Sequence, residues 1–245
     1  MGREDNTQNG LDSKDSGPAS EKLSKFELTT NSTIDALIDF LQNKPNDFDQ
    51  VIEGIISHEA KQRRVVSLSL AKGLIAEVYV RHMLMLFDSQ SSGITIDPIP
   101  HDSIKGSYRY VREIEGGLKV LSQKGNELVT VTNFDGLVEV EGLPLAVEVK
   151  AGYHGNDRGF SFALTEQEVD KKLELLSTWF ERRDFGFMAV GVKGSVYGEE
   201  GNVEKFKQRG GVMALIPITG LELDNYATKL EQINKSFRTK KNKKI

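Results

Sequence analysis

The chain has 245 residues, which is enough for one α/β domain with a full hydrophobic core once its polar ends are set aside. It contains no cysteine, so disulfides, thiolate metal sites and cysteine nucleophiles are excluded, and any metal must be held by oxygen or histidine. The formal net charge of -4, from 32 basic and 36 acidic residues, is unlike that of a protein that coats nucleic acid nonspecifically.

Both ends of the chain read as tails. Residues 1–31 are rich in polar and small residues with almost no aliphatics, and we expect a flexible tail there. Residues 238–245 form a short basic tail, which is either solvated or adds salt-sensitive affinity for phosphate backbones. No apolar run approaches the roughly 20 residues that span a bilayer, and no signal-peptide pattern opens the chain. We expect a soluble cytoplasmic protein without a membrane partner.

Helical patterns follow the first tail. Apolar residues at 34, 37, 38 and 41 share one face of a predicted helix that Pro45 ends, and apolar positions from about 48 to 87 predict two more helices. Residues 32–65 are interpreted as an N-terminal helical extension ahead of a domain that spans 66–237. Residues 88–116 mix Ser, Gly, Pro and His around a short strand at 94–96, and we interpret them as an insertion or a substrate-facing loop.

An alternation of aromatic and basic residues, at Tyr108, Arg109, Tyr110 and Arg112, stands out within that region. Such residues stack bases and grip phosphates in proteins that bind single strands. A half-buried strand explains the same alternation better. Both interpretations remain open from the sequence.

The remaining elements are predicted in alternation. Strands are predicted at about 118–122, 127–140 and 143–150, and a helix at 165–183 begins with the capping-box pair Thr165 and Glu168. A strand at 185–192, a helix at 201–209, a strand at 212–218 and a helix at 222–237 complete the chain. The order helix, three strands, helix, strand predicts an α/β domain with a central mixed sheet flanked by helices.

The strands at 127–140 and 143–150 carry the most informative residues. Gly142 supplies the turn of a hairpin, with Asp135 on its first strand and Glu148 and Lys150 on its second. Since strand side chains alternate, Glu148 and Lys150 share one face while Val147 and Val149 face the core.

Charged groups on such an aliphatic strand need a reason to be there, because unpaired buried charge is costly. A divalent cation shared by Asp135 and Glu148 would be such a reason. Glu139 and Glu141 lie on the first strand at the same two-residue spacing as Asp135, so this strand could instead be an ordinary solvated face.

Together, Asp135, Glu148 and Lys150 resemble the signature of the PD-(D/E)XK nuclease superfamily, an acid followed across a hairpin by Glu-x-Lys. The resemblance implies Mg²⁺, with Mn²⁺ as a substitute, held by Asp135, Glu148 and the backbone carbonyl of Val149. It assigns to Lys150 the orientation of the attacking water and the stabilisation of charge on the phosphoryl oxygens. The proline that usually precedes the first acid is replaced here by Phe134.

Two flanking helices extend the resemblance. Lys72, Gly73 and Glu77 have a spacing similar to that of archaeal Holliday-junction resolvases, in which the glycine allows close packing and the glutamate reaches the metal directly or through water. The later helix often presents Gln or Lys to the active site, and Gln167 and Lys171, four residues apart, share one helix face. Lys72, Gln167 and Lys171 are therefore the predicted substrate-binding residues.

The resemblance implies a restriction-endonuclease-like αβββαβ core and a Mg²⁺-dependent DNA endonuclease that uses a metal-activated water in recombination, repair or defence against foreign DNA. Cutting two strands favours a homodimer, through the helical face around 162–180 or the N-terminal helices. Two alternatives stay open: a catalytically inactive nuclease-fold module that binds nucleic acid or protein, and a ribonuclease. A basic rim for the nucleic acid would use Lys61, Arg63, Arg64, Lys72, Lys171, Lys172, Arg182 and Arg183.

Overall fold

The computed structural model describes residues 31–62, 67–113, 117–151, 164–182, 184–193 and 200–242. The predicted N-terminal tail lies almost wholly outside these residues. At the other end, the backbone of 238–242 continues the last helix, so part of the predicted basic tail is helical. No helix in the part of the chain described here is both long and apolar enough to cross a membrane.

The described helices are six in number and lie close to their predicted positions. The first begins at Asn31, whose side chain accepts hydrogen bonds from the backbone N–H groups of Thr33 and Ile34 and so caps the helix. The fourth begins with the predicted capping box of Thr165 and Glu168. Their bounds are α1 (Ser32–Gln42), α2 (Phe48–Gln62), α3 (Leu68–Gln90), α4 (Glu166–Phe180), α5 (Glu200–Gln208) and α6 (Gly220–Asn242).

A five-stranded mixed sheet forms the centre of the protein. Its strand order is β1-β6-β7-β8-β9, antiparallel across β1, β6 and β7 and parallel across β7, β8 and β9. Along the chain, the elements around this sheet follow the order α3, β1, β6, β7, α4, β8. The strands are β1 (Ile94–Ile96), β6 (Gly136–Val140), β7 (Leu143–Lys150), β8 (Gly186–Lys193) and β9 (Val212–Thr219).

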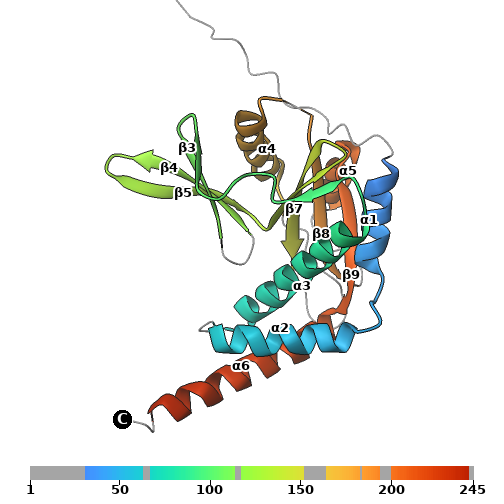
Figure 1. Ribbon diagram of the computed structural model, residues 1–245, viewed down its shortest axis with the longest axis vertical. Helices are drawn as coiled ribbons and strands as arrows, with labels where there is room; N and C mark the ends of the chain where they lie inside the picture. Colours follow the sequence, from blue (N-terminus) through green and yellow to red (C-terminus); the bar gives the residue numbers. More distant parts are fainter. Residues whose placement is uncertain are drawn as a thin grey trace, which may run out of the picture.

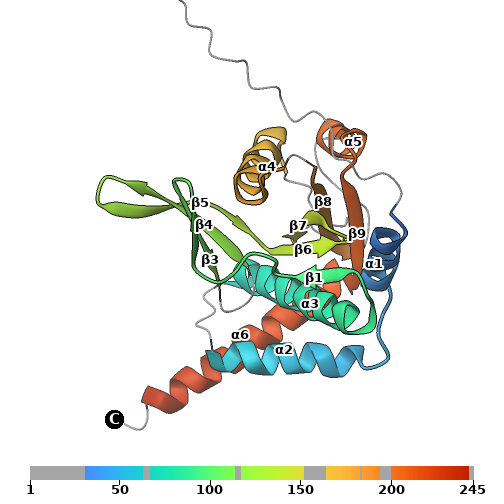
Figure 2. The same ribbon diagram turned by 45° about the horizontal axis from the view of Figure 1, so that its top comes forward.

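Helices cover both faces of this main sheet. The parallel connections pass through α4 and α5 on one side, and α1 and α3 lie on the other, with α2 and α6 packed beyond α3 (Figure 2). Leu37 of α1 and Ile56 of α2 are fully buried in the same hydrophobic core as the sheet. The predicted N-terminal extension therefore shares one core with the rest of the chain.

A second sheet, of four antiparallel strands in the order β2-β3-β4-β5, projects away from the main sheet (Figure 1). The chain leaves this sheet at Phe134 and enters the main sheet at Gly136, so Asp135 is the single residue between the two. The bounds of its strands are β2 (Ser103–Lys105), β3 (Tyr108–Arg112), β4 (Leu118–Lys124) and β5 (Glu127–Phe134).

One sequence prediction about these strands was wrong: the stretch 127–140 is not one strand, because the chain changes sheets at Asp135. Within 88–116, the short strand predicted at 94–96 is confirmed as β1, and the structure adds β2 and β3. The predicted strand at 118–122 belongs to the second sheet, and the strand that pairs with β6 in the main sheet is β1. Pairing between segments about 40 residues apart along the chain leaves no local pattern in the sequence.

The aromatic-basic alternation of β3 is a half-buried strand at its centre. Tyr110 is fully buried, donates a hydrogen bond to the Leu175 carbonyl oxygen at 2.9 Å, and packs edge-on against Trp179 with ring centroids 4.9 Å apart. Arg112 donates to the carbonyl oxygens of Asp97 and Ile99. These contacts dock the second sheet on α4 and on the loop after β1.

Candidate active site

The hairpin of β6 and β7 forms as predicted. Glu141 and Gly142 occupy its turn with φ of 52° and 83°, a conformation that favours glycine. Glu148 and Lys150 share one face of β7, and Val147 and Val149 are buried on the other. The predicted alternation of side chains along β7 is therefore confirmed.

Asp135 is placed by the close approach of β6 to β7. A Cβ atom added at Gly136 would lie 3.3 Å from the Cβ of Val147, so only glycine fits there without a shift of its neighbour. The Oδ2 atom of Asp135 accepts a hydrogen bond from the backbone N–H of Val149 at 2.7 Å. This bond holds the first acid beside the strand that carries Glu148 and Lys150.

Glu148 is a buried carboxylate that contacts two ammonium groups. Its side chain accepts from Lys150 Nζ at Oε1, 2.7 Å away, and forms a second ion pair with Lys172 through Oε2. Glu148 and Lys172 are each only 6% exposed, and the Lys172 Nζ lies 5.2 Å from the ring centroid of Phe134. Breaking such a buried pair by removing one partner leaves a costly unbalanced charge.

Lys172, rather than Gln167 or Lys171, is the residue of α4 that enters the site. Gln167 is exposed, and so is Lys171, whose Nζ donates to the Val131 carbonyl oxygen at 2.6 Å. Each residue turns a helix by about 100°, so neighbouring positions on α4 face different directions. The prediction of Lys172 as a rim residue was wrong, because its side chain is buried.

A sequence signal for Lys172 does exist. The buried residues of α4 include Val169, Leu173 and Leu176, which recur at helical spacing along one face. Lys172 lies three residues after Val169 and belongs to that same buried face. A lysine in an otherwise apolar stripe must find a buried partner, and Glu148 is that partner.

Negative charge dominates around Asp135. Burial first, then the charges of Glu148 and Glu77, raise the pKa of Asp135 to about 7, against the opposing effects of the Val149 N–H and Lys172. Glu77 therefore lies within electrostatic range of Asp135, although it is exposed on α3. The predicted association of Glu77 with the site is consistent with this effect.

The lysines and Glu168 complete the electrostatics. Burial acts to lower the pKa of Lys150, but the charge and hydrogen bond of Glu148 outweigh it, so the pKa is raised and the ammonium form is stabilised. The pKa of Glu168 is lowered by its bonds to Thr165 and, further down the order of causes, by Lys150 and Lys172. Glu168 is thus a fourth carboxylate within the field of the site, and the sequence prediction had assigned it only a capping role.

Two residues of α3, predicted to bind substrate and to allow close packing, make other contacts in the structure. Lys72 forms an ion pair with Asp224 of α6, which holds its ammonium group against the helix layer. A Cβ at Gly73 would meet only the flexible end of Glu77, at an ordinary 3.5 Å, so this glycine is not required for close packing. Of the other predicted rim residues, Arg182 pairs with Asp184, and Arg63, Arg64 and Arg183 lie outside the described residues.

The donor set fits a hard divalent cation in part. Carboxylate oxygens are the ligands that Mg²⁺ prefers, and the charges of Glu148 and Glu77 add to the burial that raises the pKa of Asp135. Both oxygens of Glu148 already contact ammonium groups, so an ion would have to share one of them with a lysine. Within the ranges that the structure describes, no group of three or more His, Cys, Asp or Glu is gathered closely enough to hold a metal.

Comparisons with known proteins add little to this geometry. No protein-family model and no curated protein matches the chain. A crystal structure of protein VC1899 from Vibrio cholerae is similar with a TM-score of 0.31 and 12% identity, over 85% of this chain and 58% of that one. The chain therefore spans little more than half the length of that protein, and a likeness this weak carries no argument about function.

Proposed function

We propose that the protein is a Mg²⁺-dependent endonuclease that hydrolyses DNA phosphodiester bonds. The observation that carries the proposal is the contact of Lys150 Nζ with Glu148 on one face of β7, directly beside Asp135, whose pKa is raised to about 7 by burial and by neighbouring acids. The order of elements around the main sheet, α3, β1, β6, β7, α4, β8, supports a restriction-endonuclease-like core with the second sheet inserted after β1.

Each residue of the site would have its own role in catalysis. Lys150 keeps its proton, and its hydrogen bond to Glu148 fixes the position of its ammonium group. From there the ammonium group can orient a water or donate to a phosphoryl oxygen of the substrate. Lys172 fixes Glu148 from the other side. The Val149 N–H orients the Asp135 carboxylate.

Asp135, Glu148 and the Val149 carbonyl are the residues that would hold the ion, and Glu77, which is not gathered with them closely enough to bind it directly, would act through a water. When bound, Mg²⁺ would supply Lewis-acid chemistry, since it lowers the pKa of a water and neutralises charge on phosphoryl oxygens. The charge that raises the pKa of Asp135 would favour its binding.

Cleavage assays test this proposal directly. The substrates are supercoiled plasmid, single-stranded DNA, a four-way junction and RNA, each with Mg²⁺, Mn²⁺ or EDTA. We expect cutting only with a divalent metal, and a loss of at least about 100-fold in Glu148→Gln and Lys150→Ala. Glu139→Gln, on the neighbouring strand β6, is the matched control and should cut normally. Metal-independent cutting, or equal activity in all variants, would sink the proposal.

The second candidate is a nuclease-fold protein that binds without cutting. It is favoured by the fact that both oxygens of Glu148 already carry a lysine, which balances this buried charge without metal. A ribonuclease would share the same site and is resolved by the RNA arm of the panel. Cleavage of both strands by two symmetry-related active sites requires a homodimer. The sedimentation coefficient of the protein, alone and with DNA, tests this.

A further inference from the structure

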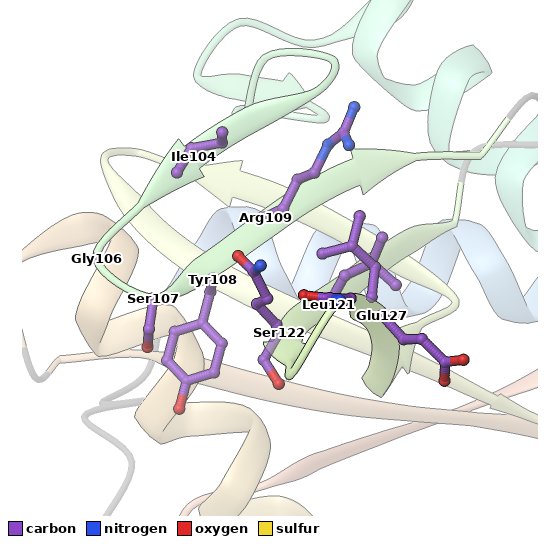
Figure 3. Close-up of a pocket in the computed structure, with 11 residues that line it drawn as sticks. Ile104, Gly106, Ser107, Tyr108, Arg109, Leu121, Ser122 and Glu127 are labelled. Carbon is purple, nitrogen blue, oxygen red and sulfur yellow. The ribbon is translucent and has the colours of Figure 1, made fainter.

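A cavity of about 700 Å³ lies in the second sheet, between the turn that joins β2 to β3 and the far end of the β4–β5 hairpin (Figure 3). It is distant along the strands from Asp135, since Glu127 and Leu128 at the start of β5 line it. Ile104 and Leu128 in its wall are 74% and 51% exposed. Large aliphatic side chains exposed around a hollow favour an apolar or flat occupant.

The remaining lining is rich in neutral hydrogen-bonding groups. Gln123, on the same face of the sheet as Arg109, and Asn126 in the turn after β4 contribute amide groups that both donate and accept, whereas Tyr108 and Ser122 belong to the opposite face, where Tyr108 packs against the core. This combination suits a flat ring with donors and acceptors along its edges.

The charge of the cavity lining determines whether the base or the phosphate of a nucleotide fits in it. The guanidinium of Arg109 is bound to Asp102 through Nε–Oδ1 at 2.5 Å and Nη2–Oδ2 at 2.6 Å, which fixes its plane and balances its charge. Glu127 adds a carboxylate to the lining. With no excess of positive charge, the cavity is unsuited to a phosphate and suited to an uncharged base, for which a fixed guanidinium plane is also a stacking surface.

The strand β5 connects this cavity to the candidate active site. The seven steps from Glu127 at the cavity to Phe134 beside Asp135 span about 23 Å at the usual rise per residue. That length matches about seven nucleotides of a stacked strand. Between the two ends, the exposed Lys171 lies against β5 with its Nζ on the Val131 carbonyl oxygen, so a cation is available to a phosphate along the way.

We propose that the cavity is a nucleobase subsite, which takes one unpaired base of the substrate strand at a fixed distance from the cut. The inference rests on the proposed function, because it requires a nucleic-acid strand to lie across Asp135 and along β5. It makes the protein selective for substrates with a single-stranded or unstacked nucleotide about seven positions from the cleaved bond.

An abasic scan of the full-length protein tests the subsite. A labelled single strand carries one abasic nucleotide, moved one position at a time along the sequence, and both kcat/KM with Mg²⁺ and binding in EDTA are measured. We expect one position, about seven nucleotides from the cut, at which the abasic substitution weakens both about tenfold. Stacking and hydrogen bonding to a single base account for an effect of that size.

The cavity variant is the double substitution Arg109→Ala with Gln123→Ala. It should bind the intact strand about tenfold more weakly and show no further loss at the sensitive position, because the base has already lost its partners. Arg182→Ala is the matched control, since Arg182 also forms an exposed pair with a carboxylate, Asp184, and lies outside the cavity lining. It should keep the full position-dependent effect.

Each result separates the two proposals. Cutting without a sensitive position overturns the subsite and leaves the nuclease intact, whereas a sensitive position in binding without any cutting supports the subsite and overturns hydrolysis. Absence of both binding and cutting overturns both. If free nucleoside monophosphates bind saturably and no position in a strand is sensitive, the cavity takes a free nucleotide. That result overturns the proposal that the base comes from the substrate strand. A change of sedimentation coefficient in the cavity variant without nucleic acid makes the cavity a contact between copies and overturns the subsite.

Discussion

The charged groups at the two sheets differ in their exposure to water. At the main sheet, Glu148 of β7 and Lys172 of α4 form a buried pair that the half-buried Lys150 joins, and Asp135, at the start of β6, is destabilised in its charged form by burial and neighbouring acids. In the second sheet, Arg109 and Asp102 pair in the open, with side chains 39% and 42% exposed. Water screens an exposed pair, whereas a buried pair has only its partners, so the same chemistry has different consequences in the two places.

The largest expected effect is the loss of stability in Lys172→Met. Glu148 then keeps only Lys150, and removing one partner of a buried pair costs about 3 kcal/mol of the free energy of unfolding. Urea unfolding in EDTA measures it. The double variant Lys172→Met with Glu148→Gln should lose less than the sum of the two single variants, because neither Lys172 nor Glu148 is then left as the unpaired charge of this buried pair. Strict additivity would show that the two side chains do not interact.

Divalent metal should act at the same cluster. With Mn²⁺ at about 100 times its dissociation constant, we expect a stabilisation of about 2.7 kcal/mol in the wild type, read as a rise of the melting temperature. Asp135→Asn should show no such rise. Lys172→Met should reach half-saturation at lower Mn²⁺, because the ion no longer competes with the Lys172 ammonium group for Glu148. A wild type that Mn²⁺ does not stabilise would favour the binding-module alternative.

Asp135→Asn should stabilise the metal-free protein at alkaline pH. The pKa of Asp135 is raised to about 7 in the folded state from an ordinary value of 3.8, so the folded state binds the proton more tightly. Wild-type stability from this group is therefore complete below about pH 4 and is lost as pH rises through 7. At pH 8 in EDTA the variant should be more stable than the wild type, and the gain should vanish at pH 4. A gain that does not depend on pH contradicts the charge explanation.

The smallest effect is expected in the second sheet. Arg109→Ala removes an exposed ion pair and should leave the melting temperature within the error of the wild type, in contrast to Lys172→Met. Differential scanning fluorimetry at low and high salt compares the two. A large loss of stability in Arg109→Ala would mean that the second sheet depends on this pair for its fold.

Much of the site could be predicted from local pattern. The two-residue repeat of a strand places Glu148 and Lys150 together and buries Val147 and Val149, whatever the rest of the chain does. Gly142 and the capping box at Thr165 fix the hairpin turn and the start of α4 in the same local way.

Other features depended on contacts between distant segments. The sequence placed α4 correctly, but only its packing on Phe134 and Glu148 decided that Lys172, and not Lys171, enters the site. The change of sheet at Asp135, the pairing of β1 with β6 and the cavity in the second sheet likewise come from segments that meet only in the folded chain. Periodicity along a sequence determines which residues share a face, and the free energy of burying that face against a particular neighbour determines where it points.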